Sequence, residues 1–178
     1  AYDRILENPD DRNYNLALYK VAWAYYRASR YPEAIQHFGK LVQWSDETQR
    51  QTGKAGSELL PEAIEYLGIA FAYDDWNENQ IPDTAEGRPS GLQRVQDPSL
   101  LPQQRAWTPD VYFQLGQVYF DEAKYPQAIA AWQLAIDKWP NHHRVPEVVN
   151  DIAVAYQMHN EFENAIATRS DLTEYVQG

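Results

Sequence analysis

The residues best suited to chemistry lie in "DDWNENQIPDTAE", residues 74–86, where oxygen-bearing side chains recur at alternate positions. Against a twelve-residue calcium loop, the ligands fall in the order Asp75, Asn77, Asn79, the backbone carbonyl of Ile81, Asp83 and Glu86. Alternation turns the oxygens toward one hard cation, and a bidentate Glu at the twelfth position can close its coordination sphere. The spacing therefore predicts a Ca²⁺ site.

This loop departs from the calcium template at one position that matters for its backbone. Gln80 stands where the template places glycine for a sharp turn, and a non-glycine residue with positive φ carries a strain cost. With two Asn in place of Asp, we expect modest affinity, in the range of roughly 10⁻⁴ to 10⁻³ M that extracellular modules show. The alternative is an Asn/Asp-rich loop that hydrogen-bonds its own backbone.

Other candidate chemistry is weaker, and no catalytic residues are predicted. The sequence contains no cysteine, so it has neither a thiolate nucleophile nor a thiolate zinc site. Ser57, Ser90 and Ser99 lack an evident base, and no glycine-rich phosphate loop is present. The adjacent pair His142 and His143 follows Pro140, and neighbouring histidines in a loop rarely bind one metal together. We expect a protein that is not an enzyme.

Composition limits the classes of partner. The 178 residues carry a formal net charge of −11, and the sequence pI is about 4.7. Such a balance opposes nucleic-acid binding, because phosphate affinity comes mainly from Lys and Arg. The negative charge would also be repelled by an anionic membrane surface. The sequence contains no apolar run of about 18 residues, so direct membrane insertion is not expected. A protein or peptide partner with basic residues fits the charge better.

The elements that must position these residues are helices. In "YFQLGQVYFDEAKYPQAIAAW", which begins at Tyr112, apolar residues recur at helical spacing on both sides of a short turn. Gly116 and Ala128 are small where large neighbours lie a turn away, so two helices can approach closely there. The pattern resembles the tetratricopeptide repeat, and its matching positions are Tyr112, Leu115, Gly116, Tyr119, Ala128, Trp132, Ala135 and Pro140.

The same pattern recurs along the chain. "YRASRYPEAI" mirrors "FDEAKYPQAI" almost position for position, and "IEYLGIAFAYDDW" supplies a first helix with no recognisable second one. The resemblance implies an all-α, right-handed superhelical array of helix-turn-helix pairs. The expected repeats are residues 13–44, 58–108 (interrupted by an insertion at 74–108), 109–140 and 146–176.

Two connecting or terminal segments fall outside these repeats. The polar stretch of residues 45–58 is expected to be a mobile connection. Residues 1–9 resemble the end of a second repeat helix closed by Pro9, which favours a chain cut from a longer array. An N-terminal capping helix is the alternative.

In such an array the first helix of each pair lines a concave groove. The partner-binding residues expected on that face are Tyr19, Trp23, Tyr26, Arg27, Tyr73, Phe113, Gln117 and Phe120. Tyr and Trp offer large contact areas with few rotatable bonds, so they are good anchors. The alternative is that these aromatics pack on an adjacent helix or on an insertion. The family's carboxylate clamp uses several Lys and Arg in the groove, but here only Arg27 is available, so no such clamp is expected.

A looser resemblance concerns the setting. The stretches "NLALYKVAWAYYRASRYPEAIQHF" and "ATRSDLTEY" resemble sequences of bacterial cell-envelope tetratricopeptide proteins of the gliding-motility, Tol-Pal-associated and outer-membrane assembly types. It implies a non-catalytic interaction scaffold in an envelope complex, periplasmic or associated with the outer membrane. The alternative function is a calcium-binding module, in which Ca²⁺ orders the insertion and shapes the binding surface.

Overall fold

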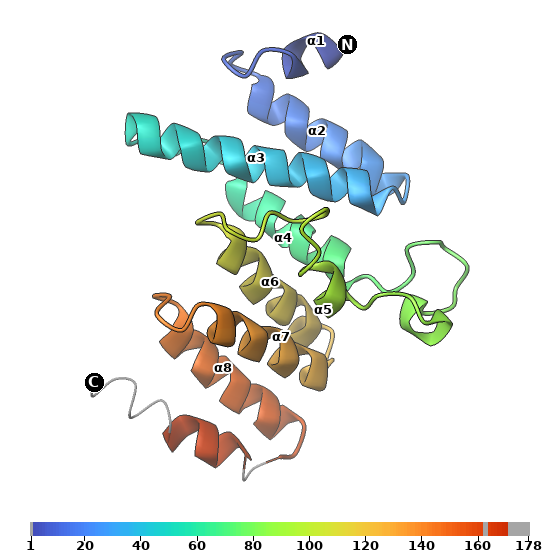
Figure 1. Cartoon of the computed structure of the whole chain (residues 1–178), viewed down its shortest axis with the longest axis vertical. Coiled ribbons are helices and arrows are strands. Elements are labelled where there is room, and N and C mark those ends of the chain that lie inside the picture. The colour runs from blue at the N-terminus through green and yellow to red at the C-terminus, as the bar shows by residue number, and fades with distance from the viewer. Residues whose placement is uncertain (1, 162–163, 171–178) are drawn as a thin grey trace. The chain divides into compact units, whose positions relative to one another are not determined.

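The computed structural model describes residues 2–161 and 164–170 of the chain, and its regular structure there is helical (Figure 1). The elements are α1 (Asp3–Leu6), α2 (Tyr14–Arg27), α3 (Tyr31–Thr52), α4 (Leu60–Ala72), the 3₁₀ helix η1 (Asp83–Glu86), α5 (Gly91–Arg94), α6 (Thr108–Asp121), α7 (Tyr125–Lys138) and α8 (Val145–Met158). Residues 164–170 are also helical, and no strand occurs in this described part. The predicted all-α fold class is confirmed. Of the last predicted repeat, residues 162–163 and 171–176 lie outside the described residues.

The helices form two compact units, Ala1–Val111 and Tyr112–Gly178. In the first unit, α3 packs against α2 on one side and α4 on the other, and α5 rests on α4 (Figure 1). Its core includes Leu18, Ala22, Phe38 and Phe71, each no more than 1% exposed. These are positions at which the helical periodicity predicts burial, because residues three and four apart share one face of a helix.

The second unit is built on a close helix contact. Ala128, Trp132 and Ala135 of α7 are buried, as predicted. The Trp132 ring lies so close to Gly116 that a Cβ added there would be 2.3 Å from the indole Cδ1 and Nε1 atoms. The indole N–H donates to the Phe113 carbonyl at 3.1 Å. The small residue therefore admits the largest side chain of the facing helix.

One turn geometry closes three helices. Ser29, Ala123 and Asn160 have left-handed φ angles of 57°, 58° and 63°. In each case the N–H of the next residue donates to the carbonyl five residues earlier, as from Lys124 to Tyr119 at 2.8 Å. The N–H of the left-handed residue itself donates to the carbonyl three residues earlier. This is the Schellman arrangement, which satisfies the last carbonyls of a helix. The sequence likeness between "YRASRYPEAI" and "FDEAKYPQAI" thus reflects a shared backbone path.

Replacing Ala123 by glycine should raise the free energy of unfolding by about 1 kcal/mol, since the left-handed conformation strains a residue with a Cβ. Urea denaturation measures the effect. Ala130→Gly is the matched control, because Ala130 is exposed within α7 and glycine there should cost about 1 kcal/mol. Equal changes in the two variants would contradict the turn geometry.

The expected mobile connection at residues 45–58 is wrong for its first half. Helix α3 continues to Thr52 and ends at Gly53, whose φ of 69° suits a glycine at a helix end. An ion pair at 3.1 Å between Arg50 and Asp46 supports the extension. Polar residues can form a solvated helical turn as readily as a loop, and composition alone does not distinguish the two. Beyond the helix, Gly56 lies against the backbone of Ser45, where an added Cβ would meet the Ser45 carbonyl oxygen at 2.4 Å.

Candidate functional site

The predicted anchors of the first unit belong to one aromatic cluster. The Trp23 ring lies 4.6 Å from Tyr66 and 5.6 Å from Tyr26, measured between ring centroids. The Trp23 indole N–H donates to the Tyr19 hydroxyl at 2.6 Å, and that hydroxyl donates to Glu62. These contacts join helix α2 to α4. We call Tyr19, Trp23, Glu62, Glu65 and Tyr66 the first-helix face.

The predicted partner-binding residues of the first unit are partly, not fully, available to a partner. Tyr19, Trp23 and Tyr26 are each of intermediate exposure, whereas Arg27 is exposed and Tyr73 is 41% exposed. Tyr26 and Tyr73 both pack on Tyr31 of α3. The predicted alternative, packing on an adjacent helix, therefore accounts for part of each of the aromatic side chains Tyr19, Trp23, Tyr26 and Tyr73. Truncating Trp23 would remove internal packing as well as surface.

The first-helix face combines neutral tyrosine hydroxyl groups with the carboxylates of Glu62 and Glu65. Burial raises the pKa of Tyr66, and the nearby Glu62 and Glu65 carboxylates raise it further. Burial likewise raises the pKa of Tyr19, with the hydrogen bond to Glu62 adding to it. These tyrosines stay neutral at physiological pH and present hydroxyl groups beside two carboxylates. Such a surface suits hydrogen-bond donors and cations.

The predicted anchors of the second unit differ from one another. Phe113 is 1% exposed, so the expectation that it contacts a partner is wrong. Its neighbours Val111 and Tyr112 are also buried, which makes α6 apolar around more of its circumference than a single stripe. Gln117 and Phe120 are of intermediate exposure. Gln117 donates to Asp121 at 2.8 Å, and the Phe120 ring lies 5.4 Å from Tyr125.

The predicted calcium loop hydrogen-bonds its own backbone. The Asp75 carboxylate accepts from the N–H groups of Asn79 and Gln80 at 3.1 and 3.0 Å, and the Asn79 side chain accepts from the Ile81 N–H at 2.9 Å. Gln80 has a φ of 65°, so this position does take the left-handed turn that the template assigns to glycine. The Glu86 carboxylate accepts from the side-chain amides of Asn77 and Asn79 at 3.0 and 2.9 Å.

Asp83 occupies a different environment from the other predicted ligands. It is fully buried, and its Oδ2 accepts from Arg94 at 2.6 Å and from the Trp76 N–H at 2.7 Å. Arg94, 5% exposed, also donates to the Tyr73 carbonyl at 3.1 Å, and its guanidinium lies 3.9 Å from the centre of the Trp76 ring. A cation could use Asp83 only by breaking this pair.

The Asp83–Arg94 pair anchors the insertion to the helices. Trp76 stacks on Tyr31 of α3, with ring centroids 5.8 Å apart, and the Arg94 guanidinium lies over the Trp76 ring. Sequence reasoning missed Arg94, since no spacing rule links residues eleven positions apart in an irregular segment. The one available signal is the presence of Arg and Trp in an acidic insertion, where a buried aspartate would need a cation.

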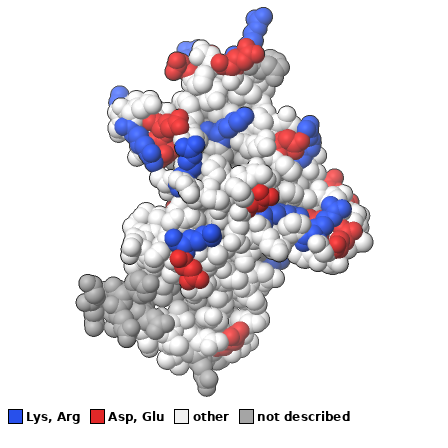
Figure 2. Space-filling model, in the orientation of Figure 1, with Lys and Arg blue, Asp and Glu red and all other residues white. Residues whose placement is uncertain are grey.

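Charge on the exposed part of the insertion is mixed. Acidic and basic side chains lie side by side over its projecting lobe (Figure 2), and Arg88 is 3.6 Å from Glu86. Among the described residues, no group of three or more His, Asp or Glu is placed to hold a metal ion. Within the same residues, no helix combines the length and apolarity needed to cross a membrane.

Two helix pairs of the chain match a known repeat family. Residues 16–43, which cover most of α2 and the first part of α3, and residues 110–142, which cover α6 and α7, match the family model of the tetratricopeptide repeat. The chain carries tetratricopeptide repeats. No curated protein matches the chain. Tetratricopeptide repeats serve as a rule in protein–protein interaction, so the first-helix face is the surface to consider first.

Proposed function

We propose that this tetratricopeptide protein is a non-catalytic scaffold that binds a basic segment of a partner protein on the first-helix face. The observation that carries the proposal is the linked set Trp23, Tyr19 and Glu62, in which half-buried aromatics hold a carboxylate at the surface. Rigid aromatic side chains lose little entropy on binding. Glu62 and Glu65 would pair with Lys or Arg of the partner, with Arg27 and Tyr73 at the edge of the contact.

The proposed setting is a complex of the bacterial cell envelope, in the periplasm or at the outer membrane, with gliding motility as the process. This part of the proposal is supported only by the resemblance of the repeat sequences to those of bacterial cell-envelope proteins. The acidic surface is compatible with it, because a chain of net charge −11 would be repelled by anionic lipid while still binding basic protein segments.

The test is capture of an envelope partner by the immobilised protein. Glu62→Gln/Glu65→Gln should reduce retention of the partner at least about tenfold, since removing charges that face a basic segment weakens binding. Glu7→Gln/Glu47→Gln is the matched control, with the same change of net charge away from this face. Equal retention by the two variants would place the interface elsewhere.

We propose calcium binding by the loop at residues 75–86 as the alternative function. Two observations favour it. The Glu86 carboxylate is within hydrogen-bond distance of the side chains of both Asn77 and Asn79, and Gln80 adopts the left-handed turn of the template. Asp75 and the Ile81 carbonyl would complete the set, while Asp83 stays with Arg94.

Calorimetry with millimolar Ca²⁺ should then give one weak site, with a Kd of roughly 10⁻⁴ to 10⁻³ M. Glu86→Gln should abolish the heat, because the distal carboxylate supplies two of the oxygens. Asp97→Asn, an exposed change outside the loop, should leave it unchanged. An equal heat from the parent protein and from Glu86→Gln would exclude this site.

A further inference from the structure

Gly39 is a helix residue that the fold itself does not require to be glycine. It lies within α3, and glycine in a helix interior costs about 1 kcal/mol relative to alanine. Its φ is not left-handed, and an added Cβ would meet only the Trp107 Cη2 atom at 3.9 Å, an ordinary contact. Gly116 differs, because the ring of Trp132 occupies the space that a side chain at that position would need. At Gly39 the missing side chain leaves space.

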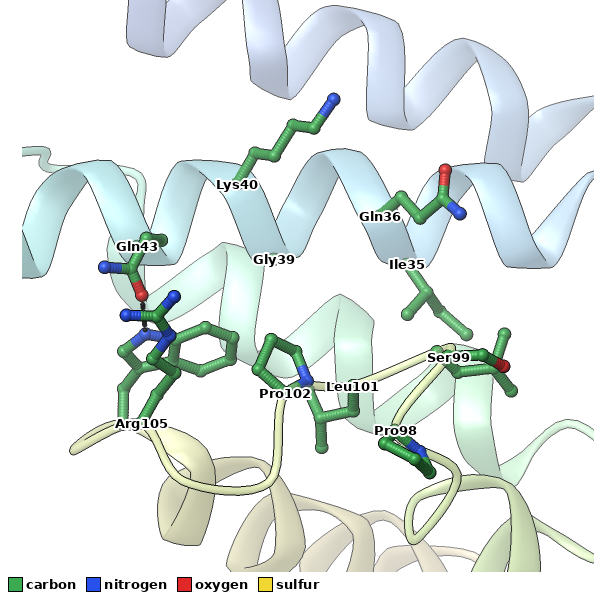
Figure 3. Close-up of a pocket in the computed structure, with 12 residues that line it drawn as sticks. Ile35, Gln36, Gly39, Lys40, Gln43, Pro98, Ser99, Leu101, Pro102 and Arg105 are labelled. Atoms are coloured by element: carbon green, nitrogen blue, oxygen red, sulfur yellow. Dashed lines mark hydrogen bonds between the residues drawn. The ribbon is translucent and has the colours of Figure 1, made fainter.

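That space is the floor of a groove between α3 and the loop of residues 98–107 (Figure 3). Ile35 points from the helix toward the loop, while Leu101 and Pro102 face it from the other side. The groove encloses about 260 Å³, enough for one or two side chains but not for a helix. We call it the α3 groove.

The walls of the α3 groove are held in place by hydrogen bonds. The Trp107 indole N–H donates to the Gln43 side chain at 2.8 Å, and the Thr108 hydroxyl donates to the Pro102 carbonyl at 2.7 Å. The Gln103 side-chain amide donates to the Val95 and Leu101 carbonyls at 2.9 and 2.8 Å. A groove with fixed walls binds without a large ordering cost.

The charge of the α3 groove is opposite to that of the chain. The full sequence has 26 acidic and 15 basic residues, yet the residues that line the groove include Lys40 and Arg105 and no acid. Lys40 extends from α3 on the side away from the loop, and Arg105 extends from the loop itself (Figure 3). The two cations thus flank an apolar floor on different sides.

We propose that the α3 groove binds an extended acidic segment of a partner protein. One aliphatic side chain of that segment lies over Gly39, between Ile35 and Pro102. Carboxylates on either side of it face Lys40 and Arg105. This site uses none of the residues of the first-helix face, so the two proposals stand or fall separately.

The test uses two synthetic peptides, acetyl-Glu-Leu-Asp-Leu-Glu-amide and the same peptide with lysine at each acidic position. The acidic peptide should shift the NMR amide signals of Gly39, Gln43 and Leu101, and its affinity should fall as salt is raised. Gly39→Leu should weaken it at least about tenfold by filling the floor. Gly39→Leu should also keep its helical circular dichroism, since leucine favours a helix more than glycine does.

Two further variants separate charge from shape. Lys40→Gln/Arg105→Gln should weaken the acidic peptide and remove most of its salt dependence. Glu62→Gln/Glu65→Gln should leave its affinity unchanged. The proposal is overturned if the acidic peptide shifts no signal around the groove, if Gly39→Leu binds it as tightly as the parent, or if the lysine peptide binds the groove equally well.

Discussion

Asp83→Ala is expected to lower the free energy of unfolding by about 3–5 kcal/mol, because it leaves the Arg94 guanidinium buried without its partner. Arg94 is 5% exposed and has a 2.6 Å contact to Asp83. The same change frees the N–H of Trp76, whose ring stacks on Tyr31. Urea denaturation measures the loss.

Controls for this prediction lie nearby in the sequence. Arg88→Ala removes a half-exposed cation at 3.8 Å from the other Asp83 oxygen and should cost no more than about 1 kcal/mol. Asp83→Ala/Arg94→Met should recover a large part of the loss, since replacing a buried pair by apolar groups is often close to neutral. If Asp83→Ala and Arg88→Ala have equal effects, the buried pair is not the anchor.

The pair should also make stability depend on acid pH. Burial alone would raise the pKa of Asp83, but the Trp76 N–H and the Arg94 guanidinium outweigh it and hold that pKa below its ordinary value. A carboxyl with a lowered folded-state pKa adds stability above about pH 4, the unfolded range, and loses it as the pH falls through the folded-state value. Asp83→Asn should flatten this part of the pH profile.

Gly116→Leu is expected to destabilise the protein by about 3 kcal/mol or more. Even the Cβ would lie 2.3 Å from Trp132, so the whole side chain has no room unless α6 and α7 separate. The indole hydrogen bond to the Phe113 carbonyl would be lost in the same movement. Thermal or urea denaturation gives the magnitude.

The matched control for this contact is Ala130→Leu, which adds the same kind of bulk at an exposed position of α7 and should change stability by less than about 0.5 kcal/mol. In a double-mutant cycle, Trp132→Leu should relieve part of the cost of Gly116→Ala, because the two side chains compete for one volume. Additive effects would mean that the two residues are not in contact.

The sequence by itself determined the helix pairs, their turns and the close contact at Gly116. These features depend on residues within a few positions of one another: the apolar period of α6 and α7, the small residue facing Trp132, and the shared path at Ser29 and Ala123. Local spacing is enough to predict them, because a helix repeats its faces every three to four residues. The left-handed turn at Gln80 was visible for the same reason, as a position where the template needs glycine.

Tertiary structure alone decided which polar and aromatic residues are available. Asp83 has the right spacing for a calcium ligand, yet Arg94 holds it in the interior, and that pairing depends on how an irregular loop folds back on α4. Phe113 lies one position from the core stripe, yet it is buried, and the His142 ring and the Arg144 guanidinium lie against its ring from the loop after α7. The open floor at Gly39 exists because a loop some sixty residues away passes over α3 without filling it. Long-range contacts of this kind leave no periodic trace in a sequence, so spacing cannot predict them.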